Sequence, residues 1–497
     1  MAILGAYIVP HPPLIIPEVG RGNEKAIQST IDSYNEVARK IASLKPDTIV
    51  VISPHTTIYA DYFHISPGIR ASGDMAQFSA PEVNMEVRYD DRLAMTISGE
   101  STAEGIFAGT QGEQDKKLDH ATFIPLYFVN KYYTDYKVVR CGFSGMGPLE
   151  HLKFGRAIRY AADDLGRNIV IIASGDLSHK LKEDGPYGFA AEGPVFDEYI
   201  VKAIKQADLL AFLTAPQDIC SGAAECGLNS FRIMAGALEG YDIESEFYSY
   251  EGPFGVGYAV GSFKPHPAGK DDRSVTCEVA GTAQTTGNNG YSAAKDLETA
   301  YTEQFKYQMD LARKGESPIV SFARNYLEKY IKTGIKSDVS DFAEELVQGT
   351  EPAKSELASF AKTKAGAFVS IKKHGQLRGC IGTTEAIRSD LLHEVAENAI
   401  SAGIHDPRFM PIKEDELPEL TYSVDVLGAA EPIDDMSYLD PSEYGVIVTS
   451  GSKRGLLLPD LEGVDTAMQQ VEIACSKAGI TEDEEISLER FKVTRYK

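Results

Sequence analysis

Cysteine is scarce in this sequence, and the positions of the cysteines indicate the redox environment of the protein. Six cysteines occur among 497 residues, at positions 141, 220, 226, 277, 380 and 475. They form no CxxC pair, and their scatter offers no compact disulfide framework for so long a chain. We therefore predict a reducing, cytoplasmic environment.

Long apolar runs and clustered basic residues are also missing. No run of roughly eighteen or more apolar residues occurs, and the apolar start MAILGAYIVPHPPLIIP lacks a basic leader and contains early prolines. Neither a membrane span nor a signal peptide is predicted. Lysine and arginine number 49 against 73 acidic residues, which gives a formal net charge of −24. This charge opposes binding to nucleic acid or anionic lipid, so nucleic acid and membranes are excluded as main partners.

The length predicts two domains, because a single hydrophobic core stops growing at roughly 250–300 residues. Over residues 1–263, β-branched runs alternate with helical periodicity, as in the helix expected at 24–43. This pattern predicts an α/β domain with a mainly parallel sheet flanked by helices. Composition then shifts to Gly, Pro, Thr and Asn, so we place a linker and a connecting helix at 264–316. A smaller α+β domain is expected at 317–497.

Histidine is rare too, and its placement is informative. Of the ten histidines, three follow predicted strands: His11 in IVPHPPL, His55 in TIVVISPH and His179 in IIASGDLSH. Ligands and metals bind at strand ends in open α/β sheets. The recurrence therefore predicts a mononuclear metal centre in the first domain.

The two earlier histidines are the candidate imidazole ligands. His11 and His55 each stand beside proline, which stiffens the loop that must aim the ring. Two histidines and one carboxylate leave three positions open on Fe(II), which suits a reaction in which an organic substrate and dioxygen both bind the metal. Asp61, Asp176 and Glu225 are the candidate carboxylates, and spacing alone does not choose among them.

Each candidate also has a purely structural interpretation. A single histidine at a strand end is more often a hydrogen-bonded structural residue than a ligand. Glu225 is well placed to cap the helix that follows it, where a carboxylate is favourable. His120, in KLDHATFIPLYFV, could seat the next helix, and Asp176 with Ser178 could hold the GDLSH turn that contains His179.

Five motifs cover the first domain together: PHPP at 10–13, SPH at 53–55, LDHATFIPL at 118–126, SGDLSH at 174–179 and ECG at 225–227. With these motifs, residues 1–263 resemble the class III extradiol dioxygenase catalytic subunits (LigB-like), and within them the Memo-like branch. The resemblance implies Fe(II) held by His11, His55 and Glu225. It also implies an acid/base role for His179, contact of His120 with substrate or oxygen, and cleavage of a catecholic or related aromatic ring by dioxygen.

One residue departs from this pattern. Cys226 directly follows Glu225, and Memo-like proteins often present a cysteine at the metal-facing position. If its thiolate pointed inward, metal preference would shift toward copper or zinc and dioxygenase chemistry would be undermined. If Cys226 were a packed core residue instead, Glu225 would complete the iron site. We predict the arrangement with Glu225 and assign no organic cofactor.

The second domain carries QLRGCIGT at 376–383, IHDPRF at 404–409, GLLLPDLEGVDT at 455–466 and ACSKAGI at 474–480, and with these it resembles the AMMECR family. Arg378 could anchor a carboxylate or phosphate. Cys380 could be a nucleophile activated by His405 or Arg408. Alternatively, Cys380 simply fits a crowded turn and Arg378 pairs internally with Asp406. The resemblance implies no established reaction.

The fusion of these domains resembles the two-domain protein of the AmmeMemoRadiSam system, which works with a radical-SAM partner. This sequence lacks the CxxxCxxC triad, so any radical step would belong to that partner. The leading hypothesis is an Fe(II)-dependent extradiol-type dioxygenase. The alternatives are a metal-binding component that holds iron or copper without oxygenating a substrate, and a purely structural interaction protein. Oligomeric state stays open, with a homodimer compatible because dimers are common among soluble enzymes.

Overall fold

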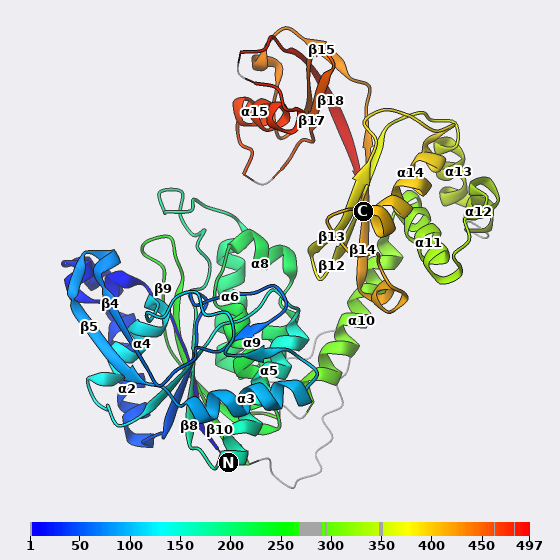
Figure 1. The fold of residues 1–497 in the computed structure, drawn as a ribbon. Helices are drawn as coiled ribbons and strands as arrows, with labels where there is room; N and C mark the ends of the chain where they lie inside the picture. Colours follow the sequence, from blue (N-terminus) through cyan, green and yellow to red (C-terminus); the bar gives the residue numbers. More distant parts are fainter. Residues whose placement is uncertain (1, 268–290, 294–295, 347–350, 462, 482) are drawn as a thin grey trace. The chain divides into compact units, whose positions relative to one another are not determined.

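The computed structural model describes residues 2–267, 291–293, 296–346, 351–461, 463–481 and 483–497 (Figure 1). The chain divides into two compact units, Met1–Phe305 and Lys306–Lys497. Helix α10 (Leu297–Gly315) crosses the boundary between them. Of the predicted linker, residues 264–267 belong to a strand, and 268–290 lie outside the described residues.

The first unit is built on a seven-stranded sheet in the order β11-β9-β10-β1-β8-β2-β7. Its strands are β1 (Ile3–Val9), β2 (Thr48–Ile52), β7 (Lys137–Cys141), β8 (Ile169–Ser174), β9 (Tyr241–Glu251), β10 (Tyr258–Pro267) and β11 (Tyr291–Ala293). Strands β1, β8, β2 and β7 run parallel, whereas β10, β9 and β11 add an antiparallel edge. The prediction of a mainly parallel sheet flanked by helices is confirmed.

Two hydrophobic cores cover the two faces of this sheet. In β8, Ile169 and Ile171 point into one core, and Val170 and Ile172 point into the other. Because both faces are covered, the strand is a continuous apolar run rather than an alternating one. The first core contains side chains of α3 (Asp91–Ala103), α5 (Pro148–Leu165), α6 (Glu192–Gln206) and α9 (Leu228–Leu238), and the second contains those of α2 (Gln28–Leu44) and α4 (His120–Asn130).

Shorter elements lie in the loops of this unit: α1 (Pro17–Gly20), β3 (Phe63–His64), β4 (Arg70–Met75), β5 (Ala80–Arg88), β6 (Ala108–Gly109), α7 (Leu209–Thr214) and α8 (Gln217–Ala223). Strands β4 and β5 form an antiparallel pair, and β3 pairs with β6 in parallel. None of the described helices is long and apolar enough to cross a membrane.

The second unit combines helices with an antiparallel sheet in the order β13-β12-β14-β18-β16-β17, with β15 paired to β18. The strands are β12 (Ala367–Lys373), β13 (Gln376–Gly382), β14 (Leu420–Leu427), β15 (Glu431–Ile433), β16 (Tyr444–Ser450), β17 (Lys453–Leu457) and β18 (Ser487–Tyr496). The helices are α11 (Pro318–Thr333), α12 (Val339–Leu346), α13 (Glu351–Phe360), α14 (Leu391–Ile400) and α15 (Ala467–Ala478). The expected α+β class is confirmed.

Helices α5 and α9 pack backbone to backbone, and this contact seats the loop that precedes α9. A methyl group on Gly236 would lie 1.9 Å from the Leu152 carbonyl oxygen, and one on Gly155 would lie 2.0 Å from the Ile233 carbonyl oxygen. Only a residue without a side chain fits at either position. The first turn of α9, and the residues just before it, are therefore held at a fixed depth against the sheet.

We predict that Gly236→Ala destabilises the first unit by about 1–3 kcal/mol, because the added methyl overpacks the α5–α9 contact. The measurement is thermal unfolding of the full chain by calorimetry. Gly99→Ala is the matched control: Gly99 is an exposed residue of α3 with no atom within 4 Å of the added methyl. Alanine is the better helix former by about 1 kcal/mol there, so its Tm should stay level or rise. Equal decreases of Tm in both variants would contradict the interpretation that the added methyl overpacks the α5–α9 contact.

Candidate metal centre

His11 is held by contacts that leave one ring nitrogen facing the interior of the site. The residue follows β1, is 2% exposed, and its Nδ1 lies 3.1 Å from the Ser174 hydroxyl. Its backbone N–H donates to Asp176 at 2.7 Å, and the Tyr34 hydroxyl donates to the carbonyl of Pro10. With Nδ1 occupied by a partner, Nε2 is the nitrogen available to a ligand.

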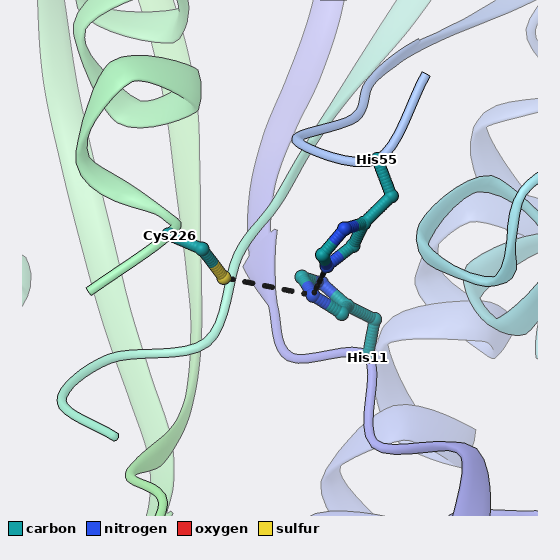
Figure 2. Close-up of side chains that lie close together, drawn as sticks. All are labelled: His11, His55 and Cys226. Atoms are coloured by element: carbon teal, nitrogen blue, oxygen red, sulfur yellow. Dashed lines mark hydrogen bonds between the residues drawn. The ribbon is translucent and has the colours of Figure 1, made fainter. Parts of the chain in front are cut away.

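His55 and Cys226 direct their donor atoms at this nitrogen (Figure 2). The Nε2 atom of His55 lies 3.1 Å from Nε2 of His11, and the Cys226 sulfur lies 3.6 Å from the same atom. The three donor atoms all lie within 4.8 Å of one another. Imidazole nitrogen and thiolate sulfur are ligands of zinc, copper and iron, so this group could hold one metal ion.

A close approach of two turns brings Cys226 to His11. A methyl group on Gly175 would lie 2.1 Å from the Cα of Gly227. Gly175 belongs to the turn after β8, and Gly227 follows Cys226 at the start of α9. Because neither residue has a side chain, the two backbones touch, and the Cys226 sulfur reaches within 3.8 Å of the Asp176 carbonyl oxygen.

The structure places Cys226, and not Glu225, beside the two imidazoles, which corrects the predicted ligand set. The Glu225 carboxylate accepts the backbone N–H of Leu228 at 2.7 Å, in the first turn of α9. The first N–H groups of a helix have no partner within it and attract a carboxylate, so Glu225 caps the helix. Of the other candidate carboxylates, Asp61 is exposed, and Asp176 accepts the His11 backbone N–H through one oxygen while its other oxygen lies 3.9 Å from His11 Nε2.

The remaining predicted histidines of the first unit gather around this group. His120 is the first residue of α4, and its ring stacks on His55 with centroids 4.3 Å apart and lies 5.4 Å from the ring of His11. The backbone N–H of His179 donates to the Ala223 carbonyl at 3.0 Å, and its ring lies close enough to His11 to affect its ionisation. Thus the four histidines singled out in the first domain converge.

Burial and mutual repulsion keep these imidazoles neutral. The pKa of His11 lies well below its usual value because the ring is buried and because charges on His55, His120 and His179 would repel its own. Burial and His55 lower the pKa of His120 to about 4. Burial, followed by Asp176 and Glu225, holds the pKa of the Cys226 thiol well above its usual value. Neutral histidines are ready ligands, whereas the thiol must release a proton when metal binds.

Several supporting residues were not singled out from the sequence as parts of the site. Ser174 and Asp119 lie inside the motifs SGDLSH and LDHATFIPL, so the motifs already contained them. Tyr187 stacks on His179 with centroids 5.1 Å apart. It lies in an irregular loop, and no pattern in the sequence marks it.

Asp197 fixes the turn that leads to His179. Its carboxyl accepts the backbone N–H of Ser178 at 2.7 Å and the hydroxyl of Tyr250 at 2.6 Å. The residue is 1% exposed, and burial raises its pKa to about 7. The turn before His179 therefore depends on a carboxyl that resists ionisation.

The predicted residues of the second unit are paired with one another or with acidic neighbours. Arg378 makes a bidentate contact with Glu416 at 2.9 and 3.0 Å. The suggestion that Arg378 pairs with Asp406 is therefore wrong: Asp406 accepts from Arg408 at 2.7 and 3.0 Å instead.

Cys380 is hydrogen-bonded to the Asp406–Arg408 pair. Its backbone N–H donates to Asp406 at 2.9 Å, its carbonyl accepts from Arg408, and its sulfur accepts the Ser370 hydroxyl at 3.2 Å. His405 is exposed, and within the described part of the chain no hydrogen bond joins it to Cys380. The structure thus joins Cys380 and Arg408 by a hydrogen bond, whereas Arg378, on the same strand as Cys380, is bonded to Glu416.

Comparison with known families matches each unit separately. Residues 5–261 match the model of the catalytic LigB subunit of aromatic ring-opening dioxygenase, and residues 320–497 match the AMMECR1 model. Both matches confirm the resemblances drawn from the motifs.

Relatives extend over the whole chain or over one unit. Protein CA_C1420 of Clostridium acetobutylicum is 37% identical over the full length of both chains. A protein of Thermotoga maritima is 45% identical over 37% of this chain and 99% of its own. Among solved structures, the uncharacterized protein PH0010 of Pyrococcus horikoshii is 28% identical over 36% of this chain and 89% of that one, with a TM-score of 0.31. The uncharacterized protein JW3007 of Escherichia coli K12 is 16% identical over 52% and 99%, with a TM-score of 0.34.

We predict that Asp197→Asn changes how stability depends on pH. The folded pKa of about 7 exceeds the unfolded value of about 3.9, so the stabilising effect of the protonated carboxyl is complete below pH ~4 and is lost as pH rises through about 7. Asparagine does not ionise, so the variant does not lose this stability as pH rises. The Tm of the variant relative to wild type should therefore rise between about pH 4 and 7, measured by circular dichroism. Parallel Tm curves for the two proteins would refute it.

Proposed function

We propose that this chain, which belongs to the LigB family of aromatic ring-opening dioxygenase subunits and carries a C-terminal AMMECR1 domain, is a metal-dependent oxidoreductase. The observation that carries the proposal is the convergence of His11, His55 and Cys226, whose donor atoms lie within 4.8 Å of one another. The reaction proposed is cleavage of a catecholic or related aromatic ring with dioxygen.

The donor set fits a transition metal. His11 and His55 offer neutral nitrogens, and the contact of His11 Nδ1 with Ser174 fixes the ring so that Nε2 faces the other donors. The family leads us to propose Fe(II) as the resident ion. Copper and zinc are the alternatives, because the Cys226 thiolate is a soft ligand.

When bound, the metal would supply a Lewis-acidic, redox-active centre at which an aromatic diol and dioxygen could meet. The protein itself supplies proton handling. Burial, together with the nearby His55, lowers the pKa of His179, so its imidazole is neutral at working pH and able to accept a proton from a substrate hydroxyl. His120 is neutral for a similar reason, and its ring N–H could donate to a developing negative oxygen. Tyr187, stacked on His179, holds the plane of that ring.

A second candidate function is favoured by Cys226. A thiolate in place of a carboxylate suits a protein that holds iron or copper for a modification system and oxygenates nothing. The proposed partner is then a radical-SAM protein, and co-purification from cell extract tests that association. For the second unit, its internally paired arginines support no specific reaction.

We predict that the full chain, purified without oxygen and loaded with Fe(II), binds one ion per chain. In His11→Ala and Cys226→Ala, metal content measured by elemental analysis should fall to about a tenth or less, because a ligand is removed. Glu225→Gln is the matched control: it neutralises the neighbouring residue, which caps α9, and should retain its metal. Loss of metal in Glu225→Gln with retention in Cys226→Ala would show that the carboxylate is the ligand.

We further predict that the loaded protein consumes oxygen and opens the ring of at least one compound in a series of catechols. His179→Ala should retain its metal and lose roughly 10²- to 10⁴-fold in turnover, the usual contribution of a general acid/base. The measurements are an oxygen electrode and the absorbance of the ring-opened product. Bound metal without oxygen uptake across the series favours the second candidate function, and a chain that binds no metal points to a structural interaction protein.

A further inference from the structure

Arg140, on the edge strand β7, is a completely buried cation that faces a single loop. It is 1% exposed and the largest of the fully buried side chains among the described residues. Its guanidinium donates to the Glu113 carboxylate at 3.2 Å, to the Asp115 carbonyl at 2.9 Å and to the Lys117 carbonyl. Its Nε donates to the Ser66 hydroxyl at 2.6 Å. Apart from the Ser66 hydroxyl, the contacts fall on alternate residues of one stretch, 113–117.

Asp119, the next alternate residue after Lys117, links Arg140 to the metal centre. The Arg140 guanidinium lies 3.7 Å from the carboxylate of Asp119, the residue directly before His120. Asp119 caps the first turn of α4 and accepts the hydroxyl of Ser53 at 2.6 Å. The Ser53 oxygen in turn accepts the backbone N–H of His55 at 3.1 Å. One chain of polar contacts thus leads from Arg140 to the backbone of His55, and Asp119 within it directly precedes His120.

The chemistry of the side chain explains why arginine stands here. Burying a charge is unfavourable, and replacing a buried ion pair by apolar residues often leaves stability unchanged or improves it. Stability alone is therefore a weak reason for Arg140. A guanidinium, however, presents five N–H donors in a fixed plane, which can hold several oxygens of one loop in a single arrangement. Lysine has no such geometry.

We propose that Arg140 is a positioning residue of the metal centre. It fixes residues 113–119, and through Asp119 it sets the orientation of His120 and of the His55 backbone. This inference rests on the proposed function, because it concerns the same group of ligands. Arg140 itself contacts neither the three donor atoms nor a substrate, so its effect is indirect.

The test uses the full chain and Co(II) alone as the probe, since its visible bands report coordination geometry. Arg140→Met should bind Co(II) about 10- to 100-fold more weakly than wild type, with shifted bands, the usual effect of losing a supporting contact. Arg140→Lys keeps the charge, so its Co(II) affinity should lie between those of wild type and Arg140→Met. Arg324→Met is the matched control, because Arg324 is a buried arginine of the second unit that pairs with Glu316 and Glu328.

A second readout needs no metal. Amide hydrogen exchange at residues 113–119 should accelerate in Arg140→Met and stay at the wild-type rate in Arg324→Met. Unchanged Co(II) affinity in Arg140→Met overturns the proposal, whatever the exchange rates. If Arg140→Met does not fold, Asp119→Asn interrupts the same chain of contacts and should give the same loss. A wild-type chain that takes up no Co(II) overturns the proposed function, and the exchange comparison then decides whether Arg140 orders the loop.

Discussion

The parallel register of β1, β8 and β2 is the constraint on which the metal centre depends. In this sheet Val9 pairs with Ser174 and Ile52 with Ala173, so the three strands end at the same level. Loops that leave such strand ends must meet at one edge of the sheet. His11 and His55 are thereby brought together from distant positions in the sequence, although no local contact joins them along the chain. The two covering cores maintain this register, because a slip by one residue would exchange the two buried faces.

A second set of contacts, between backbones, decides which residue completes the donor group. The α5–α9 packing fixes the depth of α9, and the touching turns at Gly175 and Gly227 fix its first residues. At that point Glu225 turns toward the free N–H groups of the helix, and Cys226 turns toward His11. Helix capping and close packing thus act on these neighbouring residues in opposite directions, and Cys226 is the one that lies beside His11 and His55.

The ionisable side chains have different surroundings in the two units. In the first unit, the histidines lie close together and are neutral. The cation that we propose to position them, Arg140, is fully buried. In the second, Arg378 and Arg408 are each satisfied by a carboxylate, Glu416 and Asp406. A crowded neutral group is ready for a metal ion, whereas each of these arginines already has its charge matched by a carboxylate. The metal centre is accordingly the better supported site.

Sequence alone was enough to predict the α/β class of the first unit, the α+β class of the second and the four histidines of the first, because hydrophobic periodicity and strand-end motifs are local signals. The prediction of Glu225 rather than Cys226 beside these histidines did not match the structure, since the two consecutive residues occupy one motif and only their contacts at the start of α9 separate them. Nor could sequence alone identify Arg140, Asp197 or Tyr187 as supports. The partners of Arg140 and Asp197 lie far along the chain, and the stacking of Tyr187 on His179 depends on the path of an irregular loop. Burial, hydrogen-bond geometry and ring stacking exist only once the tertiary structure has formed.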